Sequence, residues 1–206
     1  MMDTGRYTLL LSRVMRRLYE RGLVDSKGGN ASLRVRLGGL DVVLITPSGV
    51  WKAEIDPDDV AALTLDGVVL YGRPSVEYPM HLEIYRRLGA SAVVHAHNPL
   101  ATALGESTLL EAMLPETIDT CIASVPHYPS GSRELAEAVA SRMAESGCRL
   151  VVIEGHGVVA AAHGEPEKAL LKALDLVESV ELAAQRLLAR LALGAARLGE
   201  ALRWPW

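Results

Sequence analysis

The sequence contains no phenylalanine and few aromatic residues of any kind, and it has only two cysteines, Cys121 and Cys148. The cysteines lie far apart and match neither a CxxC motif nor a disulfide framework, so we expect both to be buried apolar fillers. A structural zinc site usually closes with four Cys or His ligands, and two cysteines with no such spacing disfavour one.

Long uninterrupted apolar runs are also missing, so no stretch is predicted to span a membrane, although half of the residues are apolar. The first 22 residues combine a short apolar stretch with following charges, and they have no small-residue cleavage site. This is not the pattern of a signal peptide. We therefore expect an amphipathic N-terminal helix and a cytoplasmic protein.

A basic stripe is absent as well. The net charge is −4, and the arginines and lysines are scattered along the chain, which argues against a nucleic-acid partner. No internal repeat or low-complexity linker divides the sequence. We therefore predict one domain over residues 1–206.

Short segments of β type alternate with helical segments along the chain. Residues 31–37 and 40–49 flank a glycine pair and predict a hairpin. Residues 75–89 predict a helix, with Ser75 near its N-cap and Gly89 at its C-terminal stop. Hairpins mixed with helices favour a single α/β domain in which helices flank a mainly antiparallel central sheet.

A buried strand ends in two histidines within the segment "AVVHAHNPL", residues 92–100. Side chains alternate along a strand, so His95 and His97 point to one face about 6.5 Å apart and can converge on one ion. Asn98 suits a helix N-cap and Pro99 a first helical position, which places the pair between a strand and a helix. Two separately satisfied histidines are the alternative interpretation.

A third histidine, His156, lies between two glycines in "RLVVIEGHGVVAAA", which we predict to be one buried strand interrupted at the histidine. The glycines indicate either a bulge or a close approach by another group. A catalytic zinc site typically takes three protein ligands and keeps one open position. The spacing alone does not show that His156 meets the other two histidines.

Glu77 lies in the first turn of the predicted helix 75–89. The helix dipole explains a carboxylate there without any function, whereas beside a metal-bound substrate it would be a general base. His81 follows four residues later on the same helical face, either behind the site or at the surface.

Three turns offer groups that can bind an anion through backbone N–H groups or hydroxyls, although ordinary turn chemistry explains each one alone. The candidates are Gly28, Gly29, Asn30, Thr46, Ser48, Gly49 and Ser75. Together they suggest a phosphorylated substrate.

The segments "KGGNASLR", "ITPSG", "SVE…H", "VVHAH" and "EGHGVVAAA", in this order, resemble the class II aldolase/adducin family, and most of all its L-fuculose-1-phosphate aldolases. The resemblance covers nearly the whole chain. It implies a three-layer fold with a sheet of about nine strands, and a homotetramer whose active sites lie between subunits.

The resemblance also implies the roles of individual residues. His95, His97 and His156 would hold one Zn²⁺ per subunit, and Glu77 would be the catalytic acid and base that also touches the resting metal. The implied phosphate-binding set is Asn30, Ser48, Gly49 and Ser75, with Gly29 and Thr46 beside them.

The activity implied is cleavage of a ketose 1-phosphate to dihydroxyacetone phosphate and a short aldehyde through a metal-stabilised enediolate. A methylthioribulose-1-phosphate dehydratase, a pentulose-phosphate 4-epimerase and a non-catalytic adducin-like interaction module are the alternatives. The chain departs from the family at Val76, where a second phosphate-binding serine is common, and in residues 114–124, which contain no tyrosine to act as the acid at the aldehyde end. The C-terminal "RWPW" is also short.

Overall fold

The structure is a computed structural model of the chain, and it describes residues 4–112 and 121–201. Most of residues 114–124, the segment without a tyrosine, and all of the C-terminal "RWPW" lie outside these described residues. The elements are α1 (Gly5–Glu20), β1 (Asn30–Leu37), β2 (Leu40–Ile45), the 3₁₀ helix η1 (Pro57–Asp59), β3 (Ala61–Thr64), β4 (Val69–Tyr71), α2 (Tyr78–Leu88), β5 (Ala92–Ala96), α3 (Pro99–Ala112), β6 (Ile122–Val125), α4 (Arg133–Ser146), β7 (Leu150–Ile153), β8 (Gly157–Ala162) and α5 (Pro166–Ala201).

One sheet runs through the middle of the molecule in the order β4-β3-β2-β1-β5-β8-β7-β6. Of its neighbouring strands within the described ranges, only β6 and β7 are parallel. The prediction of a mainly antiparallel sheet in an α/β domain is therefore confirmed. The described residues supply eight strands, where the family resemblance implies about nine.

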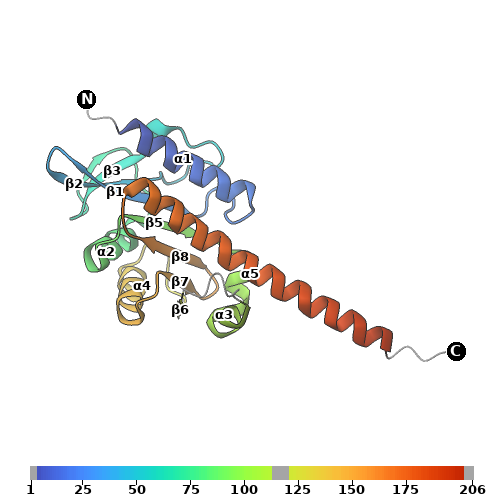
Figure 1. Cartoon of the computed structure of the whole chain (residues 1–206). Coiled ribbons are helices and arrows are strands. Elements are labelled where there is room, and N and C mark those ends of the chain that lie inside the picture. The colour runs from blue at the N-terminus through green and yellow to red at the C-terminus, as the bar shows by residue number, and fades with distance from the viewer. Residues whose placement is uncertain (1–3, 113–120, 202–206) are drawn as a thin grey trace.

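Helices cover both faces of this sheet and make three layers (Figure 1). On one face, side chains of α2 and α4 form a core with alternate residues of the strands. On the other face, α1, α3 and α5 pack against the remaining strand residues. Strand alternation assigns neighbours to opposite cores: Val94 faces the α1 and α5 side, whereas Val93 faces α2 and α4. His95 lies two residues after Val93 in the same strand, so its side chain points to the same face of the sheet.

Several local predictions are confirmed. The hairpin of β1 and β2 turns at Gly38 and Gly39, and both have the positive φ that favours glycine. Gly89 ends α2 in the left-handed conformation predicted for a C-terminal stop. The helix itself begins at Tyr78, with Glu77 at its N-cap, three residues later than Ser75.

The prediction of one interrupted strand around His156 is wrong. Two antiparallel strands, β7 and β8, occupy this segment, and Ile153 pairs with Gly157 across a tight turn. Gly155 has a φ of 66° in this turn, and the His156 N–H donates to the Ile153 carbonyl at 3.0 Å. Because both strands are fully buried, their continuous apolar pattern hides the hairpin between them.

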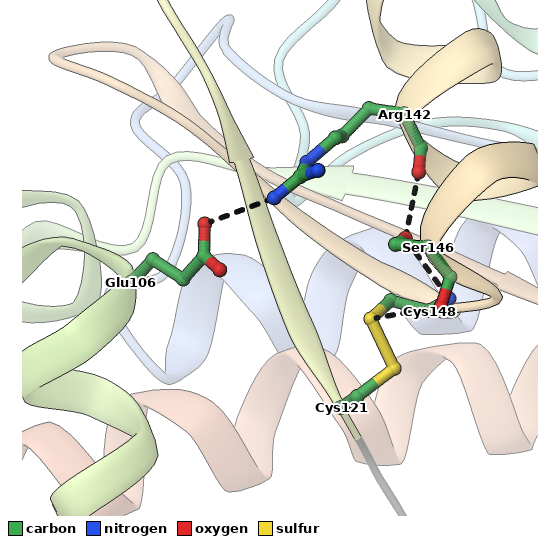
Figure 2. Close-up of a disulfide and its surroundings, with 5 residues drawn as sticks. All are labelled: Glu106, Cys121, Arg142, Ser146 and Cys148. Carbon is green, nitrogen blue, oxygen red and sulfur yellow. Dashed lines mark hydrogen bonds and ion pairs between the residues drawn. A yellow bond between two sulfur atoms is a disulfide. The ribbon is translucent and has the colours of Figure 1, made fainter.

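The prediction that the cysteines are separate apolar fillers is also wrong. Figure 2 shows a disulfide between Cys121 and Cys148, whose Cα atoms are 5.1 Å apart. The cysteines precede β6 and β7, and these strands run parallel with Ile122 opposite Leu150. Closing a loop of this sequence separation, 27 residues, stabilises the fold by about 3.5 kcal/mol in the chain-entropy model.

None of the described helices combines enough length with enough apolar character to cross a lipid bilayer.

Candidate active site

Two neighbouring strands bring the three predicted metal-binding histidines together. Strand β5 runs antiparallel to β8, so its carboxyl end, with His95 and the following His97, lies beside the turn that carries His156. The ring centroids are 4.9–5.2 Å apart. One ligand atom from each residue lies within 4.8 Å of the other two, which is close enough for all three to bind one ion.

The hydrogen bonding of His95 fits a metal ligand. Its ring is fully buried and its Nδ1 lies 2.9 Å from the Val158 carbonyl, to which it donates. Its Nε2 then carries a lone pair, and this buried atom has no hydrogen-bond partner among the residues that the structure describes. A metal-binding histidine typically donates its other N–H to such a carbonyl.

Burial also keeps the three imidazoles neutral. It lowers the pKa of His95, of His97 and of His156, because the low-dielectric interior disfavours the charged ring. A neutral imidazole keeps the lone pair that a metal ion needs. The donor set of three nitrogen atoms suits zinc and other divalent transition metals.

Two glycines make room for these rings. A Cβ on Gly28 would lie 2.6 Å from the His97 ring, and one on Gly157 would clash with the Ala96 carbonyl oxygen and lie 2.8 Å from His95 Cε1. The glycines that flank His156 therefore serve different purposes. Gly155 forms the turn, and Gly157 allows close packing against His95.

Replacing Gly157 by alanine is expected to weaken metal binding about 10- to 100-fold, because the new methyl group displaces the His95 ring from its position. Isothermal titration of the metal-free protein with Zn²⁺ measures the effect. Gly194→Ala is the matched control, since a Cβ there meets open space on α5. Equal affinities for the two variants would show that Gly157 does not shape the site.

Glu77 faces the histidines from the N-terminal end of α2. Its Oε2 lies 3.3 Å from His95 Nε2, and its Oε1 lies 3.5 Å from His156 Nε2. Asn30 Nδ2 donates to Oε2 at 2.8 Å, and Ser130 Oγ donates to Oε1 at 2.7 Å. The carboxylate is thus held on both oxygens and directed at the histidine cluster.

The charge state of Glu77 follows from these neighbours. Burial raises the pKa of Glu77, but the hydrogen bonds that Ser130 and Asn30 donate to its two oxygens stabilise the ionised form and bring the pKa below its usual value. The group is therefore ionised at neutral pH. A carboxylate in this position can contact a bound cation or exchange a proton with a substrate.

The predicted phosphate-binding residues lie on three loops that contact one another. The Thr46 hydroxyl accepts from the Ala31 N–H at 3.1 Å, and the Thr46 carbonyl accepts from the Ser75 N–H at 3.1 Å. The Ser48 N–H donates to the Arg73 carbonyl at 3.2 Å. Gly29 and Gly49 both have positive φ, which permits tight turns beside the site. The structure thus brings the loops together, and their role toward phosphate stays a prediction.

Sequence reasoning missed or misjudged three further residues near the site. Ser130, which binds Glu77, precedes α4 in a loop with no motif to mark it. His81 is fully buried, so the surface alternative for it is wrong. Lys52 is buried, donates to the Pro47 carbonyl at 3.0 Å beside the Ser48 loop, and has a pKa that burial lowers to about 8. The positions of these three residues beside the site become visible only in the folded chain.

Comparison with known proteins adds to this geometry. The family model of the class II aldolase and adducin N-terminal domain matches residues 10–188. An L-fuculose phosphate aldolase of Methanocaldococcus jannaschii is 35% identical over 153 residues, 71% of this chain and 79% of the relative. A 5-deoxy-D-ribulose 1-phosphate aldolase of Bacillus thuringiensis serovar kurstaki is 34% identical over 176 residues, 82% of this chain and 78% of the relative. The crystal structure of an L-fuculose-1-phosphate aldolase from Thermus thermophilus superposes with a TM-score of 0.76 at 35% identity, covering 91% of this chain and 95% of the other.

Proposed function

The chain belongs to the class II aldolase and adducin family, and on that premise we propose that it is a zinc-dependent aldolase. Its substrate would be a ketose 1-phosphate similar to L-fuculose 1-phosphate, and its products would be dihydroxyacetone phosphate and a short aldehyde. The observation that carries the proposal is the convergence of three neutral imidazoles and one ionised carboxylate on a single point. The named relatives are an L-fuculose phosphate aldolase and a 5-deoxy-D-ribulose 1-phosphate aldolase, which supports the substrate class.

His95, His97 and His156 would hold the ion, one per subunit. The unpartnered Nε2 of His95 supports this assignment, as does the neutral state of all three rings. When bound, a divalent cation would act as a Lewis acid that stabilises negative charge on the enediolate form of the substrate. The histidines contribute no charge of their own, so they leave the full positive charge of the ion available.

Glu77 would move the proton. In the condensation direction its carboxylate removes a proton from the carbon next to the carbonyl group of dihydroxyacetone phosphate, and in cleavage it returns that proton to the same carbon. Its hydrogen bonds from Asn30 and Ser130 hold both oxygens, which aims the base before substrate arrives. A positioned general base of this kind contributes about 10²- to 10⁴-fold to the rate.

The three loops would bind the substrate phosphate. Ser48 and Ser75 would donate through their hydroxyls, and the turns at Gly29, Asn30 and Gly49 would offer backbone N–H groups. Thr46 would lie beside them, since its own N–H donates to the Ala31 carbonyl at 3.0 Å. The mutual contacts of these loops support a single pocket. Binding at this remote group would hold the reacting carbon against Glu77, so that the reaction becomes effectively intramolecular.

A homotetramer with active sites between subunits forms part of the proposal. Helix α5 extends well beyond the sheet that it packs against (Figure 1). This helix exposes several leucine side chains, and the edge strand β4 exposes its three apolar residues. These exposed residues are Leu182, Leu188, Leu191, Leu193, Val69, Leu70 and Tyr71. A neighbouring subunit would also supply the acid at the aldehyde end.

A panel of phosphorylated ketoses tests the activity. With zinc-loaded protein, dihydroxyacetone phosphate is expected from L-fuculose 1-phosphate or from ribulose 1-phosphate, detected by a coupled reductase that consumes NADH. Water loss from methylthioribulose 1-phosphate without carbon–carbon cleavage would replace the aldolase with the dehydratase. Interconversion of pentulose 5-phosphates would favour the epimerase, and no reaction with any substrate would favour the interaction module.

A further inference from the structure

A group of polar side chains lies buried behind Glu77, between α2 and the sheet. Asn30 and Ser32 come from β1, and His81 and Tyr85 come from α2. Each of these four residues is at most 2% exposed to solvent. They form a continuous series of hydrogen bonds that begins at the carboxylate and ends inside the core.

The distances define the series. Asn30 Nδ2 lies 2.8 Å from Glu77 Oε2, and Asn30 Oδ1 lies 2.5 Å from His81 Nε2. On the other side of the imidazole, His81 Nδ1 lies 2.6 Å from Ser32 Oγ. The Ser32 hydroxyl in turn lies 2.6 Å from the Tyr85 hydroxyl.

Donor and acceptor chemistry fixes the direction of every bond in this series. An ionised carboxylate only accepts, so Asn30 must present its NH₂ to Glu77 and its carbonyl oxygen to His81. His81 Nε2 must then carry the proton, and in a neutral ring this leaves Nδ1 as an acceptor. Ser32 has one hydrogen and gives it to Nδ1. Tyr85 therefore donates to Ser32.

The environment supports the charge states that this order requires. Burial lowers the pKa of His81 to about 3, so its ring stays neutral. Burial raises the pKa of Tyr85, so its phenol keeps the proton that it donates. Every buried donor in the series then meets an acceptor, and reversing any one bond would place two acceptors or two donors against each other.

We propose that Tyr85, Ser32 and His81 are positioning residues that lock the Asn30 amide with its NH₂ toward Glu77 and so hold the catalytic carboxylate in place. This inference rests on the proposed function, because it assigns the series to the proton transfer at Glu77. A free asparagine amide could present either end to its neighbour, and its carbonyl end would repel the carboxylate. The His81 tautomer removes that freedom.

Variants of His81 test the effect on proton transfer. His81→Phe fills the space but has no polar atom, so Asn30 loses its orientation. We expect the rate constant kcat for exchange of the carbon-bound protons of dihydroxyacetone phosphate with solvent to fall about 10- to 100-fold, the loss of one hydrogen bond to a charged group. KM should change little, because only the Asn30 side chain is disturbed and the hydroxyls and backbone N–H groups proposed to bind the phosphate stay in place.

Two comparison variants separate positioning from general disruption of the core. His81→Gln keeps an N–H near the Nε2 position and is expected to restore most of the exchange rate. Ile84→Val removes a methyl group from the same buried helix face and should leave exchange unchanged. Wild-type exchange in a folded His81→Phe protein, or an equal loss in Ile84→Val, would overturn the proposal.

The decisive measurement needs no substrate. ¹⁵N-histidine NMR of the wild-type protein should show His81 as a neutral ring protonated on Nε2 across the neutral pH range. A ring protonated on Nδ1 would reverse the series and overturn the proposal, whatever the activity. If instead the wild-type protein fails to exchange protons of dihydroxyacetone phosphate, the proposed function fails while the tautomer result stands by itself.

Discussion

Replacing Glu77 by glutamine is expected to slow proton exchange at the substrate carbon by orders of magnitude while leaving the protein folded and able to bind zinc. The amide has almost the same shape as the carboxylate but cannot take up a proton at neutral pH. Its oxygen can still accept from Asn30, and its NH₂ can face Ser130, whose hydroxyl also accepts. The fold therefore keeps its hydrogen bonds, and only the chemistry is lost. The expected decrease is about 10²- to 10⁴-fold.

Solvent exchange of dihydroxyacetone phosphate in D₂O, followed by proton NMR, measures this loss separately from carbon–carbon cleavage. Glu83→Gln is the matched control. Glu83 is a carboxylate on the same helix that pairs with Arg86 and Arg87 at the surface. That variant should exchange at the wild-type rate. If Glu77→Gln exchanged just as fast, Glu77 would have no part in the proton transfer.

His95→Ala is expected to lose zinc and activity together. His95 is the most deeply buried of the three histidines, and the Val158 carbonyl fixes its tautomer. Removing it takes away the nitrogen ligand that a backbone carbonyl holds in place, so zinc should bind far more weakly. Since the ion is worth several kcal/mol of charge stabilisation, we expect activity to fall about 10³-fold or more.

Metal content by plasma mass spectrometry, measured on the same samples as activity, tests this expectation. His163→Ala makes the same chemical change at an exposed histidine outside the cluster and should keep both metal and activity. His97→Ala, at a less buried ring, repeats the test if His95→Ala fails to fold. Full zinc occupancy in a folded His95→Ala protein would contradict the ligand assignment.

Local sequence signals were sufficient for much of the fold and for the parts of the site that lie within single segments. Alternation and the following "NP" located His95 and His97 at a strand end, and Gly89 marked the end of a helix. The prediction that His156 joins this pair came from the family resemblance. It depends on the β5–β8 pairing, which joins segments about 60 residues apart and leaves no trace in spacing.

The features that could not be predicted from the sequence also depend on contacts between segments that lie far apart in the chain. The disulfide arises because β6 and β7 are parallel neighbours, and the separation of Cys121 and Cys148 alone contains no such information. Ser130 reaches Glu77 across 53 positions. The burial of His81 depends on polar partners in β1, whereas a histidine in an amphipathic helix is by itself equally compatible with the surface.

Helix α2 carries Glu77 at its N-cap, His81 four residues later and Tyr85 four residues after that. With 3.6 residues per turn, these three side chains lie along one face of the helix. Inserting or deleting a single residue between them would turn one member about 100° away from the others. Length variation among homologues should therefore be found in turns such as Gly38–Gly39, and the interval from Glu77 to Tyr85 should keep a constant length wherever the enzyme still works.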